Sequence, residues 1–338
     1  MTKSLDALLR EWYAQNQRVL PWRSDPSPYH VFLSESMLQQ TRVAQARGHY
    51  LRFIEALPSF EALAEASEEE VLKLWEGLGY YSRARNLRKA AIKVIEDFGG
   101  ELPRDKESLL ALPGVGRYTA AAISSLAFHQ KEVAIDGNLV RVYARLKALP
   151  LDPKSEKDKR QAEQGLLAEM GEDPSSFNQA LMDIGELFCL PHGTPLCATC
   201  PLKGICLAHG KNEETKYPLQ TKKATRRIED WTFFLLRHDE ALLLEKRPDH
   251  GLLASLYGLP GVLGHLNEKE ARYYIENEFG YAVETIENLG EARHVFSHVE
   301  WHMKAFQITV KAKKDGLWAS QEDIENRYSI PTAFSYFL

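Results

Sequence analysis

The sequence predicts a multidomain chain, with a mostly α-helical domain over residues 1–209 and an α+β domain over residues 228–338. Three observations support this division. Helical periodicity with capping residues and terminal glycines runs through the first 209 residues. Residues 210–227 (GKNEETKYPLQTKKATRR) are polar and basic, as in a linker. Beyond them, the apolar pattern takes the shorter period of strands.

The bulk composition is that of an ordinary globular protein with room for two cores. Of the 338 residues, 44% are hydrophobic and 26% charged, and no apolar run reaches membrane-spanning length. The opening MTKSLDALLREW does not read as a signal peptide, so we expect a cytoplasmic protein without a membrane partner. The net charge of -5 argues mildly against a nucleic-acid partner, so any such binding must use local patches.

Caps and glycines place the helices of the first domain. SEEEVLKLW opens with Ser67 and has Glu70 three residues later, which is a capping box. It ends at Gly77 and Gly79, and SRARNLRKAAIKVIEDF follows as far as Gly99 and Gly100. This second segment carries a basic run headed by tyrosines: Tyr80, Tyr81, Arg83, Arg85, Arg88, Lys89 and Lys93. Such a run is usually a solvated helix face, but aromatic rings beside cations also suit nucleic acid.

A glycine-rich turn predicts a helix–hairpin–helix motif. KESLLAL and RYTAAAISSLAF flank the turn PGVG, which contains Gly114, Val115 and Gly116. Glycines allow close backbone approach, and the following helix N-terminus offers free N–H groups, so the turn could bind a DNA phosphate. The alternative is an ordinary turn between two helices.

The second domain shows strand and helix patterns in alternation. WTFFLLRHDEALLLEKR predicts two strands joined at residues 238–240. NEKEARYYIENEFG predicts a helix closed by Gly280, and HVEWHMKAFQITVKAK predicts a long strand.

All four cysteines lie within one short segment, with the spacing C-x7-C-x2-C-x5-C: Cys189, Cys197, Cys200 and Cys206. A reducing compartment disfavours structural disulfides, so this clustering indicates a metal site. Structural zinc usually has two short cysteine knuckles, whereas only one is present here. Four separated thiolates suit an iron–sulfur cluster better, with zinc as the alternative.

Two carboxylates stand out because their surroundings differ. Three of the four helical neighbours of Glu35 in LSESMLQQT are apolar, so burial should raise its pKa and let it act as a general acid. Asp136 follows a short apolar run and precedes a helix, where backbone N–H groups should keep its pKa low. The alternatives are a surface glutamate and a simple N-cap. As a pair they suit cleavage of a glycosidic bond through an oxocarbenium-like state.

A set of ordered motifs resembles the bacterial adenine DNA glycosylase (MutY) family of the helix–hairpin–helix DNA glycosylase superfamily. The resemblance is dense over residues 8–209 and thinner beyond. The motifs are LPWR (20–23), SESMLQQT (34–41), WEGLGYYSRARNL (75–87), LPGVGRYTA (112–120), AIDGNLVRV (134–142), FNQALMDIG (177–185) and the four cysteines.

The resemblance implies a base-excision-repair enzyme that removes adenine mispaired with 8-oxoguanine or guanine from double-stranded DNA after flipping it out. Glu35 would be the acid at adenine N7, and Asp136 would stabilise the sugar cation through a transient covalent adduct. Tyr118 and Asn138 would support them. The adenine pocket would hold Trp22, Arg23 and Gln179, while Gln40 and Tyr80 would enter the base stack. Tyr118 stands where glycosylase-lyases of the superfamily carry lysine, which implies a monofunctional enzyme.

The resemblance extends to a [4Fe-4S] cluster on the four cysteines and to a Nudix-like second domain. Phe296, Ser297 and His298 match the family loop that contacts 8-oxoguanine, whereas EARYYIENEFG lacks the glutamates of a catalytic Nudix box. We therefore expect a nucleoid-associated monomer that recognises the lesion. A thymine-mismatch glycosylase, a non-catalytic lesion-binding protein and a Nudix hydrolase are the alternatives. Two features depart from the family pattern. The interval between the first two cysteines is x7, where the family usually has x6, and Ser36 stands where the family usually has Ile or Val.

Overall fold

The computed structural model describes residues 3–219 and 225–338, so residues 220–224 of the predicted linker lie outside the described part. The chain forms two compact units that do not follow the order of the sequence. Of the described residues, the first comprises 3–65 and 86–219, and the second comprises 66–85 and 225–338. A segment of 20 residues from the predicted helical domain therefore packs as part of the second unit.

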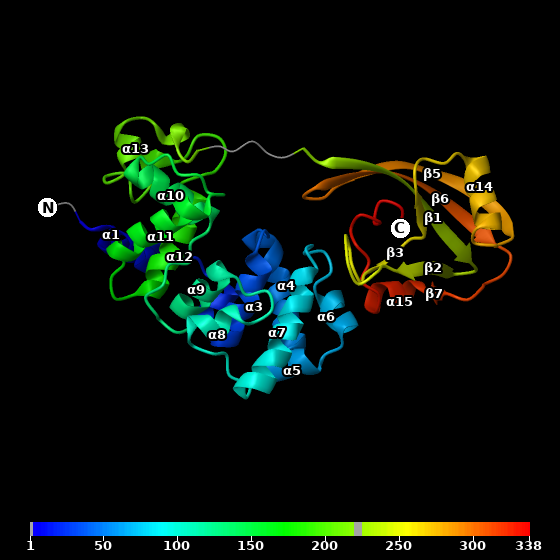
Figure 1. Ribbon diagram of the computed structural model, residues 1–338, viewed down its shortest axis with the longest axis horizontal. Helices are drawn as coiled ribbons and strands as arrows, with labels where there is room; N and C mark the ends of the chain where they lie inside the picture. Colours follow the sequence, from blue (N-terminus) through cyan, green and yellow to red (C-terminus); the bar gives the residue numbers. More distant parts are fainter. Residues whose placement is uncertain (1–2, 220–224) are drawn as a thin grey trace. The chain divides into compact units, whose positions relative to one another are not determined.

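The first unit is helical (Figure 1). Its helices are α1 (Leu5–Asn16), α2 (Pro21–Ser24), α3 (Pro28–Leu38), α4 (Val43–Ala56), α5 (Phe60–Glu65), most of α7 (Ser82–Phe98), α8 (Lys106–Leu110), α9 (Arg117–Leu126), α10 (Gly137–Lys147), α11 (Glu156–Glu169), α12 (Pro174–Leu187) and α13 (Leu207–Gly210), with 3-10 turns at Cys197–Thr199 and Glu214–Lys216. The α7 segment ends as predicted, at Gly99 and Gly100, which both have positive φ.

The predicted helix–hairpin–helix motif is confirmed as α8, a turn and α9. Gly114 takes a φ of 78°, and a Cβ there would lie 2.7 Å from the Asn86 side chain, so glycine is required. Gly116 precedes α9 as its N-cap. Tyr118 is the second residue of α9, so the turn sets the direction in which that phenol leaves the helix.

One core of the first unit joins α1, α10 and α12. Leu5, Leu9, Leu139, Phe177 and Leu181 are all fully or almost fully buried in it. This packing holds the start of α10 and one face of α12, two of the elements that border the candidate site.

The second unit contains α6 (Glu68–Leu74) and a seven-stranded sheet whose central order is β3-β2-β1-β6-β5 (Figure 1). Its elements are β1 (Arg227–His238), β2 (Ala241–Lys246), β3 (Tyr257–Gly258), β4 (Gly261–Leu263), α14 (Glu268–Asn277), β5 (Val283–Val295), β6 (Val299–Val310), β7 (Leu317–Ala319) and α15 (Gln321–Asn326). The predicted hairpin is confirmed, with Arg237 opposite Leu242, whereas β1 and β6 pair in parallel.

Both faces of this sheet are covered. Phe233 and Leu235 of β1 enter one core with Phe334 of the C-terminal segment, while Phe234 and Leu236 enter another with Ile275 of α14. The predicted helix over NEKEARYYIENEFG is confirmed as α14, which starts with a complete capping box. Within the described residues, no helix is both long and apolar enough to cross a bilayer.

Candidate active site

A cavity of about 500 Å³ opens in the first unit between α3, α9, α12 and the N-terminus of α10. The predicted catalytic and adenine-pocket residues meet in its lining, although up to 157 positions separate them in the sequence. They are Trp22, Arg23, Glu35, Tyr118, Asp136, Asn138 and Gln179. The structure thus brings together all seven side chains that were predicted to act on the adenine.

Glu35 is buried, with a relative exposure of 5%, in the last turns of α3. Its Oε2 accepts a hydrogen bond of 2.8 Å from the Tyr118 hydroxyl. Burial raises the pKa of Glu35 to about 7; the Tyr118 bond acts in the opposite direction, and the nearby Asp136 adds to the rise. The predicted increase is confirmed, and near neutral pH this carboxyl has protonated and ionised forms in similar amounts.

Tyr118 remains a hydrogen-bond donor under all ordinary conditions. Burial, together with the negative charges of Glu35 and Asp136, raises the pKa of its phenol well above the usual value. The hydroxyl therefore stays protonated and turns its hydrogen toward Glu35.

Asp136 caps α10, as predicted. Its Oδ1 accepts from the Leu139 N–H at 2.8 Å, and its Oδ2 accepts from the Asn138 side-chain amide at 3.0 Å. The predicted low pKa is wrong, however. Burial raises the pKa of Asp136 from its ordinary value, because desolvation outweighs these hydrogen bonds and the attraction of Arg141.

Arg141 connects the surroundings of Asp136 to the cysteine segment. It is buried on α10 and donates to the Cys189 carbonyl at 2.7 Å and to the Gly185 carbonyl at 2.9 Å. Its charge also lowers the pKa of Asp136. The sequence motif AIDGNLVRV contains Arg141, but nothing local indicated that its side chain would turn inward.

A buried ion pair forms another part of the cavity wall. Both terminal nitrogens of Arg23 donate to Asp183, at 2.7 and 2.9 Å, and Arg18 lies 3.8 Å from the same carboxylate. Trp22 packs edge-on against Tyr50. Sequence reasoning missed Arg18 and Asp183; the spacing of Asp183, four residues after Gln179 on α12, was the available signal.

The predicted DNA-contacting residues of this unit lie outside the cavity lining. Gln40 follows the end of α3, is exposed, and has a φ of 59°. Gly116 is also exposed, with open space around its Cα. Val115 differs from expectation, because its side chain is buried and its N–H donates to the Leu112 carbonyl at 3.1 Å. In this hairpin the two glycines are exposed, whereas Val115 is not.

Ser36, which the sequence left without explanation, has a partner inside its own helix. Its hydroxyl donates to the Phe32 carbonyl at 2.8 Å and is buried. A serine can therefore replace an apolar residue here without an unmatched hydroxyl.

The four cysteine side chains line a single small cavity, beside α10 and the end of α12. Arg145 donates to the Cys189 sulfur at 3.3 Å and to the Leu190 carbonyl at 2.9 Å, so a buried cation faces this sulfur set. Burial raises the pKa of Cys197 to about 12 and that of Cys200 to about 11. A bound cation would therefore have to displace thiol protons.

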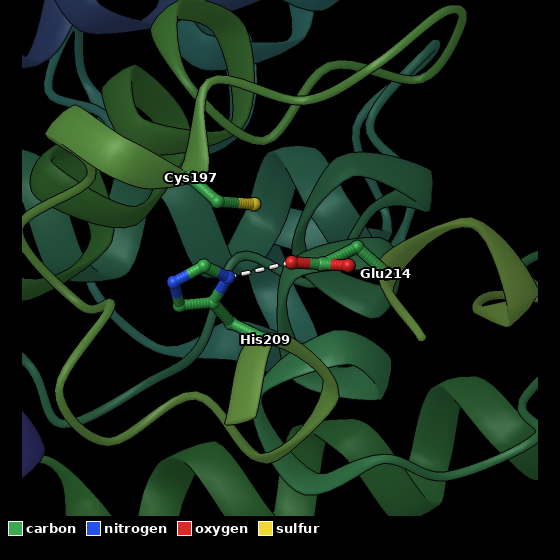
Figure 2. A group of neighbouring side chains, drawn as sticks. All are labelled: Cys197, His209 and Glu214. Atoms are coloured by element: carbon green, nitrogen blue, oxygen red, sulfur yellow. Dashed lines mark hydrogen bonds and ion pairs between the residues drawn. The ribbon is translucent and has the colours of Figure 1, made fainter. Parts of the chain in front are cut away.

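One of the cysteines belongs to a second group of donors. The Cys197 sulfur, a ring nitrogen of His209 and a carboxylate oxygen of Glu214 lie within 4.8 Å of one another. Figure 2 shows Cys197 above the pair that His209 Nδ1 and Glu214 Oε1 form at 2.6 Å. Sulfur, nitrogen and oxygen donors together suit zinc, so the donor chemistry alone does not decide between zinc and an iron–sulfur cluster.

A cavity of about 630 Å³ lies in the second unit. The predicted lesion-contacting residues Tyr80, Phe296, Ser297 and His298 all contribute to its lining. Tyr80 has a φ of 48°, and its hydroxyl lies 2.5 Å from the Ser297 hydroxyl. The structure therefore brings together these four residues, from segments that are more than 200 positions apart.

The basic run beside Tyr80 is only partly a solvated face. Arg83 is buried, stacks on the Trp75 and Tyr80 rings, and donates to the Gly79 carbonyl at 3.0 Å. Arg85 donates to the Ala254 carbonyl at 2.7 Å. These two cations support the turn at residues 77–80 and the wall of the second cavity.

Two protein families match separate parts of the chain. The HhH-GPD superfamily of base excision DNA repair proteins matches residues 33–167, and the NUDIX domain family matches residues 232–338. The predicted fold class is confirmed, with a helix–hairpin–helix domain followed by a Nudix-like domain.

Curated relatives extend the similarity over most of the chain. The adenine DNA glycosylase of Mus musculus is 35% identical over 89% of this chain and 70% of its own length. The adenine DNA glycosylase of Buchnera aphidicola subsp. Acyrthosiphon pisum (strain APS) is 33% identical over 91% of this chain and 87% of its own length.

Solved structures resemble the helical part. A thermostable thymine-DNA glycosylase superposes with a TM-score of 0.55 and 31% identity, covering 61% of this chain and 94% of that one. A trapped endonuclease III–DNA covalent intermediate has a TM-score of 0.52 and 24% identity, covering 60% and 93%. At that identity, the second match supports the fold alone.

Proposed function

Because the chain belongs to the adenine DNA glycosylase family of base-excision-repair enzymes, we propose that its substrate is adenine mispaired with 8-oxoguanine or guanine in double-stranded DNA. The observation that carries the proposal is the cavity in which the Tyr118-bonded Glu35 and the α10-capping Asp136 face one space. Two carboxyl groups in different surroundings suit glycosidic bond cleavage.

The adenine must leave the duplex before it can reach these groups. The cavity of about 500 Å³ is large enough for a nucleobase. We assign its walls at Trp22, Arg23 and Gln179 to the flipped base. Asp183 fixes the Arg23 guanidinium by two hydrogen bonds, so Arg23 presents a constant orientation to a base.

Glu35 supplies the proton. With a pKa of about 7, its protonated form is well populated near neutrality, and it donates to adenine N7. The base then accepts the electron pair of the N-glycosidic bond and leaves as neutral adenine. Glu35 becomes a carboxylate, which the Tyr118 hydroxyl stabilises by the 2.8 Å bond, and it regains a proton from the water that adds to the sugar.

Asp136 stabilises the positive sugar that forms as the bond breaks. The Leu139 N–H and the Asn138 amide hold its carboxylate in one position, and Arg141 favours its charged form. A fixed anion beside the developing cation lowers the barrier without reorganisation. Since Tyr118 provides no amine for a Schiff base, the proposed enzyme is monofunctional and leaves an abasic site.

The cavity of the second unit is our proposed site for the base opposite the adenine. Phe296, Ser297 and His298 would contact 8-oxoguanine there, with Tyr80 entering the stack. On the first unit, exposed Gln40 would enter the stack, and Gly114 and Gly116 would receive a phosphate. We expect the protein to bind this DNA as a monomer.

We further propose that Cys189, Cys197, Cys200 and Cys206 hold a [4Fe-4S] cluster. Four sulfurs around one cavity and a cation donating to the Cys189 sulfur fit such a group. When bound, it would tie residues 189–206 into a fixed loop, which Arg141 and Arg145 already attach to α10. A broad visible absorption at roughly 400 nm supports the cluster, whereas a colourless zinc-containing protein refutes it.

The decisive experiment is an excision assay on labelled duplexes that contain adenine opposite 8-oxoguanine or guanine. The proposed enzyme produces an alkali-labile site at the adenine, and no strand break before alkali treatment. Absence of an alkali-labile site in both duplexes rejects the proposal.

A thymine-mismatch activity is the second candidate, favoured by the solved thymine-DNA glycosylase that is 31% identical over 61% of this chain. A thymine opposite guanine in the same assay separates the two, because a pocket that hydrogen-bonds adenine leaves polar groups unmatched around thymine. Excision of thymine but not of adenine would favour this second candidate.

A further inference from the structure

The lining of the second-unit cavity comes from segments that are far apart in the sequence. Residues 77–82 supply one wall and residues 294–298 another, while residues 251–254 and 331–333 complete the lining. More than 200 positions of sequence separate the first two walls, so non-covalent contacts must set their spacing. The hydroxyls of Tyr80 and Ser297 lie 2.5 Å apart and bridge these two walls directly.

Helix α6 precedes the wall at residues 77–82 and is hydrogen-bonded to the segment at the end of α15. Lys73 Nζ donates to the carbonyls of Ile324 at 3.0 Å and Tyr328 at 3.3 Å. Carbonyls at a helix C-terminus lack partners within the helix and attract a cation, so Lys73 caps α15 from outside.

Glu76 accepts hydrogen bonds from both sides of this contact, whereas Lys73 donates them. Its Oε2 accepts from Lys73 at 2.6 Å, and its Oε1 accepts from the Ile330 N–H at 2.7 Å. In addition, the buried Ser329 hydroxyl donates to the Leu72 carbonyl at 3.2 Å. We call this set the α6 latch, formed by Leu72, Lys73 and Glu76 on one side and Ile324, Tyr328, Ser329 and Ile330 on the other.

The α6 latch lies directly next to the cavity along the chain on both sides. Glu76 precedes Gly77, the first residue of one wall, and Ile330 precedes Pro331, which also lines the cavity. Gly77, Gly79 and Tyr80 all have positive φ, so the turn that follows the latch has a defined, compact course. A shift of Glu76 would therefore be passed directly to Tyr80.

We propose that Lys73 and Glu76 are positioning residues that hold Tyr80 and the 331–333 segment in place beside the 294–298 loop, and thereby set the selectivity for the base opposite the adenine. This inference rests on the proposed function. None of the latch residues lines the catalytic cavity. Loss of the α6 latch should therefore change lesion recognition and leave adenine release unaffected.

The experiment uses the full chain and compares Glu76→Ala, Glu76→Gln and Ser329→Ala with Glu70→Ala, which changes an exposed glutamate in the first turn of α6. Glutamine keeps the oxygen that accepts from the Ile330 N–H. Dissociation constants are measured in a Glu35→Gln background for duplexes with adenine opposite 8-oxoguanine or guanine, and kcat is measured with Glu35 intact.

We expect Glu76→Ala to weaken binding of the 8-oxoguanine duplex by about tenfold, the usual effect of one lost charged hydrogen bond. Binding of the guanine duplex and kcat should change by less than about threefold, and Ser329→Ala should have a smaller effect of the same kind. Glu76→Gln should lie within about threefold of the unchanged protein, as should Glu70→Ala. Equal weakening for both duplexes, or Glu76→Gln behaving like Glu76→Ala, overturns the inference.

Hydrogen–deuterium exchange tests the latch without reference to any substrate. In Glu76→Ala, amides of residues 77–81 and 294–298 should exchange faster, whereas Glu76→Gln and Glu70→Ala should match the unchanged protein. Unchanged exchange in both peptides overturns the inference. Failure of the proposed function would give a different result. In that case the unchanged protein itself would release no adenine or show no preference for 8-oxoguanine.

Discussion

The two cavities of this protein have similar volumes, about 500 and 630 Å³, but different chemistry. The first is lined by ionisable groups. Glu35 has a pKa of about 7, and the Arg23–Asp183 ion pair forms part of the wall. The second is lined mainly by glycines, aromatic rings and hydroxyls, with Arg85 and two histidines, and burial lowers the pKa of His294, which favours the uncharged ring. Bond cleavage requires charge in a desolvated place, whereas recognition of a base requires shape and a few hydrogen bonds.

The largest expected effect lies at the centre of the first cavity. Glu35→Gln removes the transferable proton but keeps the side-chain shape and an acceptor for the Tyr118 hydroxyl. Single-turnover excision should fall by about 10²- to 10⁴-fold, while binding of mismatched duplex is retained. An excision rate close to that of the unchanged protein would refute the acid role of Glu35.

Asp136→Asn separates the charge of this residue from its capping role. Asparagine still accepts from the Leu139 N–H, so α10 and the melting temperature should be preserved. The single-turnover rate should nevertheless fall by about 10²-fold, because the sugar cation loses its anion. If the rate and the melting temperature both remain unchanged, the carboxylate is only a cap.

The pH profile of excision should reflect the raised pKa of Glu35. The protonated form is active, and its fraction falls about tenfold per pH unit above the folded-state pKa of about 7, so the rate should decline along the alkaline limb. Tyr118→Phe removes a bond that favours the ionised form, which should move that limb to higher pH. A limb that stays in place or moves to lower pH would contradict this assignment.

Smaller effects are expected in the second cavity. Ser297→Ala should lower the preference for 8-oxoguanine over guanine by about three- to tenfold, the usual value of one hydrogen bond. The rate of adenine release at saturating enzyme should remain unchanged. A comparable loss of that rate would mean that the two cavities do not divide chemistry from recognition.

Local rules were sufficient for most of the helices but not for the edge of the sheet. Ser67 and Asn267 cap their helices, and Gly99 and Gly280 end theirs with positive φ, as their sequence neighbourhoods indicate. Strand β5 was not predicted. It is largely exposed, rich in glutamate and interrupted near Gly290, so it lacks the apolar alternation of a strand and depends on its pairing with β6.

The candidate site likewise combines features that follow from the local sequence with features that depend on tertiary contacts. The sequence alone singled out the candidate residues: Glu35 with its apolar neighbours, Asp136 as a cap, the four cysteines and the hairpin before Tyr118. Only the tertiary structure decided the raised pKa of Asp136, the inward course of Arg141, and the packing of residues 66–85 in the second unit. Caps and turns depend on neighbours within a few residues, whereas desolvation and ion pairing depend on groups that folding brings in from distant parts of the chain.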